Sequence, residues 1–452
     1  MWGMHTIVPW SPWTSAEQPE ISAIHRLHDE REVVALIGTP LTGPRGRFGI
    51  VGIPSRSIRL QPDNSPLSSL LGSRSGKFRI IALGYELGRP WVQLPVTPAP
   101  RGQPPGMFFE FDSVLVVDHL LHRWAVLGDP SDVNERFIRK ITSPLSSNPA
   151  PCGTAVLHPL TSDALHETRI RAAKEHIAAG NIYQANIARR LKVIGDINAV
   201  GAVTALSSLN PVAHGSYIRT DNFELVSNTM ETLLNLHPRS RLIESFPIKG
   251  TCRRLPHESP EDPIPQRLVA TPKERAEHVM IVDLVRNDLG KICVPGTIKV
   301  PTLMGLEGYQ GVWHGVSTVQ GELQPHQQLI DALRALFPGG SITGAPKRRA
   351  IEIINELEEE PRGFYTGSIG MIAPDGHASF SILIRTLIKD NEGWSLSVGG
   401  GIVADSKPER EITETWEKVA VFRDLMKSPG SAQASVSSES KSANRLISKV
   451  AS

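Results

Sequence analysis

Cysteine is scarce in this chain of 452 residues, and the three cysteines, Cys152, Cys252 and Cys293, are odd in number and far apart. They offer no disulfide framework and no CxxC spacing for a metal site, so we expect a reducing compartment. Uninterrupted apolar runs of about 18 residues are also missing, which argues against a membrane-spanning helix. The N-terminus shows no basic segment followed by a long apolar run, so we expect no secretory signal and a cytoplasmic location.

An excess of charge of either sign is missing as well. Lysine and arginine number 48 against 46 aspartates and glutamates, which gives a formal net charge of +2. This balance provides no bulk attraction to nucleic acid or to anionic lipid, and we expect neither as a partner. With 40% hydrophobic and 21% charged residues, the composition is that of a folded globular chain.

Turn residues and linkers divide the chain into four stretches. Residues 1–30 lack clear periodicity and are expected to form an N-terminal extension. Between 31 and 150, short apolar runs alternate with turns, which predicts a β-rich subdomain that ends in a linker of serine and proline. Residues 151–427 are expected to form the main domain, and 428–452, rich in serine, a disordered tail.

A helix predicted over 272–290 carries one acid of interest. Thr271 as N-cap, a proline in the first turn and Glu274 at N3 form a capping-box pattern at its start. Glu277 lies just before the apolar stretch of this helix. A single glutamate at such a place is usually a capping or paired acid.

A second helix, predicted over about 407–426, carries three charged residues on one face. Glu411, Glu414 and Lys418 stand at positions i, i+3 and i+7, and spacing alone favours a solvated face with a Glu414–Lys418 ion pair. If Glu277 faced this helix across a cleft, three carboxylates would form a hard-oxygen site. Such a site suits Mg²⁺, which keeps open positions for a substrate carboxylate.

Three further side chains lie in strand-like surroundings. Lys249 precedes a Gly-Thr turn; most such lysines are exposed, but a buried one close to another cation loses its proton more readily and becomes a nucleophile. For His314 a satisfied core histidine is the default interpretation. Arg385 lies in an apolar run, where a ligand carboxylate would satisfy a buried guanidinium. The string PGGSITGAPK (338–347) lacks the spacing of a phosphate loop and is interpreted as a turn that feeds a helix.

Taken together and in order, several long strings resemble the chorismate-utilising enzymes, the family of anthranilate, aminodeoxychorismate, isochorismate and salicylate synthases. The strings are IYQAN (182–186), PIKGT (247–251), EHVMIVDLVRNDLG (277–290), HGVSTV (314–319), PGGSITGAPKRRAIEII (338–354) and GGGIVADSKPEREITETWEK (399–418). The resemblance covers roughly residues 30–427. It implies an α/β fold with two large packed β-sheets flanked by helices and a cleft between the sheets.

The resemblance also implies roles for individual residues. Those that match the family's magnesium ligands are Glu277 and Glu414, with Glu411 close by. Those that match groups around the substrate carboxylates are Tyr365, Arg385, the Gly400–Gly401 backbone and Lys418, while Gly250 and Thr251 match positions that line the ring. His314 matches the active-site histidine. Glu231 matches the glutamate of an SPE motif, the general acid or base, although the motif here reads Thr229–Met230–Glu231.

Two positions sort the subfamilies. Gln184 stands where isochorismate and salicylate synthases have a lysine that activates water, so addition of water is disfavoured. Lys249 stands where anthranilate synthases usually have alanine, and it matches the nucleophile of the aminodeoxychorismate synthases. The resemblance therefore implies Mg²⁺-dependent amination of chorismate towards 4-aminobenzoate and folate. A separate glutamine amidotransferase subunit would deliver the ammonia. Two alternatives are an anthranilate synthase and, because of the altered SPE motif, a non-catalytic relative that only binds chorismate.

Overall fold

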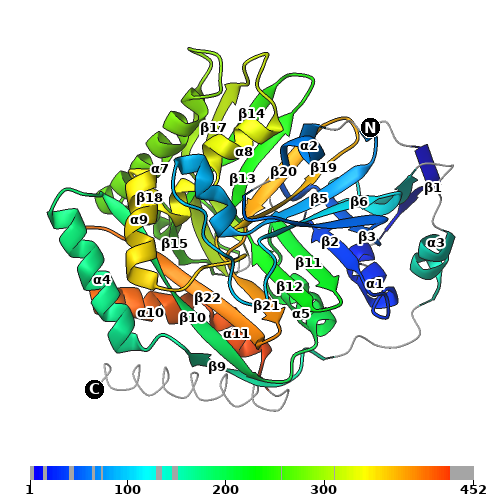
Figure 1. Cartoon of the computed structure of the whole chain (residues 1–452), viewed down its shortest axis with the longest axis horizontal. Coiled ribbons are helices and arrows are strands. Elements are labelled where there is room, and N and C mark those ends of the chain that lie inside the picture. The colour runs from blue at the N-terminus through cyan, green and yellow to red at the C-terminus, as the bar shows by residue number, and fades with distance from the viewer. Residues whose placement is uncertain are drawn as a thin grey trace.

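Two large antiparallel β-sheets pack against each other and are flanked by helices (Figure 1), which confirms the predicted fold class. The predicted serine-rich tail, 428–452, lies outside the described residues. No helix in the described part of the chain is both long and apolar enough to cross a membrane. The computed structural model describes residues 5–13, 18–39, 45–63, 67–72, 75–128, 135–144, 151–255, 257–309 and 311–427.

The first sheet contains 12 strands within these ranges, and one path of hydrogen-bonded neighbours joins all but one of them. In spatial order they are β1 (His5–Pro12), β8 (Arg123–Gly128), β7 (Ser113–Asp118), β3 (Phe48–Gly52), β2 (Val33–Ile37), β11 (His214–Thr220), β12 (Phe223–Thr229), β21 (Thr386–Asp390), β22 (Gly393–Ile402), β10 (Gln184–Gly195) and β18 (Gly344–Ala345), with β9 (Ala155–Pro159) beside β10.

The second sheet contains 10 strands in the described ranges. In spatial order they are β15 (Ile248–Arg253), β17 (Val312–Glu322), β14 (Leu242–Phe246), β13 (Thr232–His237), β20 (Ala378–Ile382), β19 (Ser368–Ile372), β5 (Phe78–Leu83), β6 (Gly106–Phe111) and β4 (Arg56–Leu60), with β16 (Lys299–Tyr309) beside β17. Strands from both sides of the predicted boundary near residue 150 pair within each sheet, and the division into subdomains stays a prediction.

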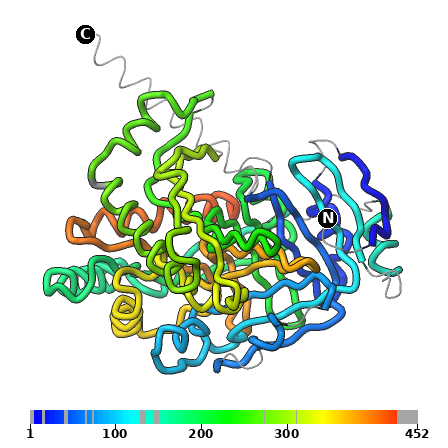
Figure 2. The backbone as a smooth tube through the Cα atoms, turned by 90° about the horizontal axis from the view of Figure 1, so that it is seen from above, coloured from blue at the N-terminus to red at the C-terminus, as the bar shows by residue number. Residues whose placement is uncertain are grey.

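Apolar side chains from both sheets form the layer between them. Ile50 and Leu225 of the first sheet belong to the same buried cluster as Phe109 and Ile369 of the second. Removal of this apolar surface from water, at about 25 cal/mol per Å², holds the two sheets together. Figure 2 shows the N-terminal strands in blue at one end of the molecule and the green to orange segments, which carry the predicted site, at the other.

Helices cover the outer faces of both sheets. They are α1 (Pro19–Arg26), α2 (Leu67–Gly72), α3 (Glu135–Thr142), α4 (Asp163–Ala178), α5 (Ala199–Leu209), α6 (Pro263–Ala270), α7 (Pro272–Gly290), α8 (Leu329–Leu336), α9 (Lys347–Glu358), α10 (Pro408–Lys418) and α11 (Ala420–Leu425); short 3₁₀ turns are η2 (Tyr85–Gly88), η3 (Pro90–Val92) and η5 (Gly340–Ile342). Buried side chains of α1, α3, α5 and α11 pack on the first sheet, those of α2, α7 and α8 pack on the second, and α4 and α9 cover β10.

Two details of the predicted helices are wrong. The helix predicted over 407–426 is two helices, because the chain leaves helical geometry at Val419, a β-branched residue buried in the core. The capping box at Thr271 does not form. Thr271 also ends α6, and its hydroxyl donates to the carbonyl oxygen of Arg267 in that helix at 2.7 Å instead.

Candidate active site

The amine of Lys249 lies where the two sheets meet. Lys249 is on β15, at one edge of the second sheet, and faces the glycine-rich end of β22 in the first. A methyl group at Gly401 would lie 3.0 Å from Lys249 Nζ and 3.1 Å from Gln184 Nε2. A side chain at this position would crowd the amine, and the structure brings Lys249, Gln184 and Gly401 together.

The surroundings of Lys249 favour its neutral form. Burial is the main cause that lowers the pKa of this lysine, and the cation of Lys418 lowers it further. The carboxylates of Glu277, Glu231 and Glu414 act in the opposite direction and do not cancel the effect. Acids from three separate segments therefore surround one amine that releases its proton more readily than a free lysine.

Glu231 lies in the turn between β12 and β13 and is only 6% exposed. Ser341 Oγ donates a hydrogen bond to Glu231 Oε1 at 2.5 Å. Burial raises the pKa of Glu231, although the hydrogen bond from Ser341 and the charges of Lys249 and Lys418 oppose it. The backbone N–H of Glu231 donates to Thr229 Oγ1 at 3.3 Å, so the threonine of the altered SPE motif stabilises the turn.

His314 is held on β17 between β15 and β16. Its Nδ1 is 3.0 Å from the hydroxyl oxygen of Thr251, so the structure brings these two predicted residues together. Burial, with Arg385 and Arg45 nearby, lowers the pKa of His314 to about 4. A hydrogen bond with the backbone of Gly250 acts in the opposite direction and does not cancel this effect. Its Nε2 is buried and has no hydrogen-bond partner among the described residues. His314 is therefore a neutral imidazole with one nitrogen left for a ligand.

Arg385 is a half-buried cation that no described carboxylate neutralises. It follows β20 in the left-handed region, with φ of 51°. Burial lowers its pKa to about 10, and Tyr309 acts in the opposite direction. An unpaired guanidinium in such a place fits an anionic ligand. Tyr365 is also buried, and burial raises its pKa to about 12 although a hydrogen bond with Asn186 opposes this shift.

The acids of α10 meet the backbone of β22. A methyl group at Gly400 would lie 3.2 Å from Glu411 Oε2 and 3.7 Å from Lys418 Nζ. Lys418 Nζ donates to the carbonyl oxygen of Gly399 at 2.8 Å and pairs with Glu414 Oε1 at 2.8 Å. The predicted Glu414–Lys418 pair therefore forms, and it points into the site and not only to solvent.

The donor chemistry of Glu277, Glu411 and Glu414 fits Mg²⁺, because carboxylate oxygens are the ligands it prefers. In the described part of the chain, however, no three or more His, Cys, Asp or Glu side chains are grouped closely enough to hold a metal ion. Glu414 is engaged by Lys418 instead. The magnesium site stays a prediction.

Sequence reasoning missed two residues of the site. Ser341 lies in the string predicted only as a turn, yet it holds Glu231. Asn186 lies in the β10 strand and interacts with Tyr365. Periodicity carries no signal for these two contacts, because each joins segments that are far apart in the chain.

Gly250, a predicted residue, has φ of 78°, which favours glycine, and a methyl group there would face Leu268 at 3.0 Å.

Comparison with known proteins gives the family of the chain. The family model described as chorismate binding enzyme matches residues 59–424. The chain is 39% identical over 333 residues to anthranilate synthase component 1 of Haloarcula marismortui, covering 72% of this chain and 64% of that protein, less than two thirds of its length. It is 36% identical over 362 residues to aminodeoxychorismate synthase component 1 of Klebsiella aerogenes, covering 80% of this chain and 78% of the relative. Anthranilate synthase component I from Streptococcus pneumoniae superposes with a TM-score of 0.74 at 25% identity, covering 84% of this chain and 92% of that chain.

Proposed function

Because the chain belongs to the chorismate-binding enzyme family, we propose that it is the synthase component that converts chorismate and ammonia to 4-amino-4-deoxychorismate. The observation that carries the proposal is the amine of Lys249, placed against Gly401 and Gln184 with its pKa lowered by burial and by Lys418. A neutral amine is a nucleophile, whereas the amide of Gln184 cannot act as a base for water.

The reaction would proceed in two substitutions. Lys249 Nζ bonds to C2 of chorismate, the ring double bonds shift, and the C4–O bond breaks. Hydroxide is a poor leaving group, so Glu231, whose pKa burial raises, gives its proton to the departing oxygen, which leaves as water. Ammonia then bonds to C4, the double bonds shift back, and the C2–N bond breaks to release Lys249. This division of one difficult substitution into two is covalent catalysis.

Substrate binding would use the cations and glycines of the cleft. Arg385, with no described carboxylate partner, is suited to one carboxylate of the chorismate dianion. Lys418, the Gly400–Gly401 backbone and Tyr365 would contact the substrate beside it. Glu277 and Glu414, with Glu411 close by, would hold Mg²⁺. Bound Mg²⁺ would supply positive charge that offsets the repulsion between these acids and the substrate.

The ammonia would come from a separate glutamine amidotransferase subunit. A second enzyme would then eliminate pyruvate and release 4-aminobenzoate for folate synthesis, in the cytoplasm.

Incubation with chorismate, MgCl₂ and an ammonium salt, followed by chromatographic and mass analysis of the products, tests the proposal. We expect 4-amino-4-deoxychorismate, and a lysine adduct on the peptide that contains Lys249 in rapidly quenched samples. Lys249→Ala should abolish this activity, whereas Lys192→Ala, an exposed lysine on β10, is the matched control. Formation of anthranilate alone would reject the proposal.

Anthranilate synthase is the second candidate, because a relative with that name is 39% identical to the chain. In that reaction ammonia adds at C2, the position that Lys249 would occupy in the leading proposal. An anthranilate synthase would therefore keep its turnover when Lys249 is replaced by alanine. Binding of chorismate without any product from ammonium salts would instead favour the non-catalytic alternative.

A further inference from the structure

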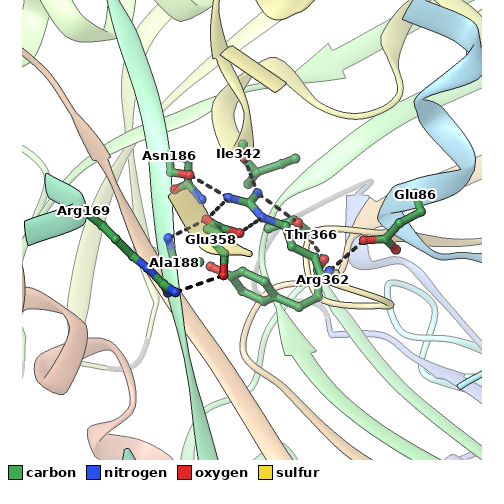
Figure 3. A network of polar contacts seen from close by, with 9 residues as sticks. Glu86, Arg169, Asn186, Ala188, Ile342, Glu358, Arg362 and Thr366 are labelled. Carbon is green, nitrogen blue, oxygen red and sulfur yellow. Dashed lines mark hydrogen bonds and ion pairs between the residues drawn. The ribbon is translucent and has the colours of Figure 1, made fainter. Parts of the chain in front are cut away.

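One buried guanidinium joins several segments that carry or adjoin residues of the site (Figure 3). The side chain of Arg362, 3% exposed, follows α9 and donates to Glu358 through Nε at 2.7 Å and Nη2 at 2.6 Å. Burial alone would lower the pKa of Arg362, but Glu358 more than offsets this and raises it. The side chain is a fixed cation in a bidentate pair.

The remaining hydrogen bonds of Arg362 reach three other segments. Its Nη2 donates to the carbonyl oxygen of Asn186 on β10 at 2.6 Å. Its Nη1 donates to the carbonyl oxygen of Ile342 in η5 at 3.0 Å and to Thr366 Oγ1 at 3.3 Å. Each contact lies next to a residue of the proposed site or on one, because Ser341 precedes Ile342 and Tyr365 precedes Thr366.

Backbone groups also hold Glu358, the carboxylate that pairs with Arg362, and the backbone of Arg362 itself. Glu358 Oε1 accepts a hydrogen bond from the backbone N–H of Ala188 on β10 at 2.8 Å. On the other side, Glu86 accepts the backbone N–H groups of Arg362 and Gly363 at 2.7 and 3.1 Å. Figure 3 shows Glu86 and β10 on opposite sides of the guanidinium. Hydrogen bonds therefore hold the pair from both sides.

We propose that Arg362 is a positioning residue for amination: through Ile342 it fixes the loop from which Ser341 holds Glu231, and through Asn186 and Thr366 it fixes β10 and Tyr365. The inference rests on the proposed function. Arg362 touches none of the reacting atoms and acts through Ser341 and Glu231. Small displacements of an acid from its productive geometry cost up to about 100-fold in rate.

Steady-state kinetics of the full chain with chorismate, Mg²⁺ and ammonium test this role. Arg362→Lys keeps the charge but loses the planar fork, so we expect kcat to fall about 10- to 100-fold while KM for chorismate changes less than about threefold. The matched control is Arg169→Met. Arg169 donates a hydrogen bond to the backbone carbonyl oxygen of Glu358 at 3.0 Å, and its described hydrogen bonds do not reach η5 or Thr366. If the role of Arg362 were purely structural, Arg362→Lys and Arg169→Met would have equal kcat values when they lose equal amounts of stability.

A double-mutant cycle with Ser341→Ala gives the second readout. If Arg362 acts in part through Ser341, the two losses in kcat do not multiply fully, and Arg362→Lys has a smaller effect in the Ser341→Ala background than in the wild type. Unchanged kcat in folded Arg362→Lys, or losses that multiply fully, would overturn the inference. Glu358→Gln replaces Arg362→Lys if that variant does not fold, with the same expected non-additivity. Formation of anthranilate by the wild type would reject the proposed function yet leave these kcat comparisons valid.

Discussion

Ser341 and Glu231, 110 residues apart in the chain, are joined by a hydrogen bond of 2.5 Å. It ties the η5 loop to the turn between β12 and β13, and it fixes the direction of the carboxyl group that is proposed to protonate the leaving hydroxyl. A hydroxyl donor stabilises the charged form of an acid. Ser341 therefore sets both the aim and the acidity of Glu231.

Ser341→Ala should lower kcat about 10-fold and move the alkaline limb of the kcat–pH profile to higher pH. The hydrogen bond from Ser341 lowers the pKa of Glu231 against the effect of burial, so its loss raises that pKa further and keeps the acid protonated at higher pH. Ser341→Thr retains the hydroxyl and should restore both quantities. An alkaline limb that moves to lower pH would contradict the role of Glu231 as an acid.

Gly401→Ala should reduce kcat/KM by about 10-fold with little change in thermal stability. The added methyl group would lie 3.0 Å from Lys249 Nζ, and the amine would have to shift by a few tenths of an ångström. Gly72→Ala is the control, since a methyl group at Gly72 would meet nothing within 4 Å. Full activity of Gly401→Ala would show that the amine does not react where the structure holds it.

The sequence predicted the parts of this site that are carried by contiguous strings. The strings that contain Lys249, His314 and Glu414 gave the family and the two-sheet fold, and spacing alone predicted the Glu414–Lys418 pair. Local rules succeeded where one helix or one strand decides the outcome. They failed at Thr271, where two helices compete for the same hydroxyl.

The missing parts depend on contacts between distant segments. Ser341 and Arg362 lie in segments whose local sequence shows only that the chain bends. Ser341 bonds to Glu231, 110 residues away, and Arg362 bonds to Asn186, 176 residues away. No periodicity reports such pairs. The metal site illustrates the same limit, because helix spacing places Glu411 and Glu414 on one face but does not fix their distance from Glu277.

Arg385→Met should weaken chorismate binding about 100-fold and at the same time raise the free energy of unfolding by about 1 kcal/mol. The methionine removes a half-buried cation that no described carboxylate pairs with, so the folded state becomes more stable while the ligand loses its partner. Titration calorimetry and urea denaturation measure the two effects. As a control, Arg47→Met breaks a pair with Asp118, 2.9 Å long, and should lower stability without changing binding. A loss of stability in Arg385→Met would mean that Arg385 has a structural partner.

Lys418→Met should move the acid limb of the kcat–pH profile to higher pH. The amine of Lys249 must be neutral to react, and Lys418 is the second cause, after burial, that lowers the pKa of Lys249. Without that cation, and with Glu414 released from its ion pair, the pKa of Lys249 rises. Lys407→Met, an exposed lysine before α10, is the control. An acid limb that stays in place would indicate that another group titrates there.

His166→Leu should make the protein less sensitive to acid without affecting the proposed chemistry. His166 is buried on α4 against β10, and burial, with Arg189 and Arg169 nearby, lowers its pKa to about 4. The unfolded chain therefore binds a proton that the folded chain excludes between about pH 6.5 and about pH 4. The stability that comes from the neutral imidazole is present above this window and is lost as the pH falls through it, by at most about 1.4 kcal/mol per pH unit.

Urea denaturation at four pH values across the window should give a shallower pH dependence of stability for His166→Leu than for wild type, while His158→Leu, a change at an exposed histidine, keeps the wild-type slope. Equal slopes for wild type and His166→Leu would show that His166 titrates alike in the folded and unfolded chain.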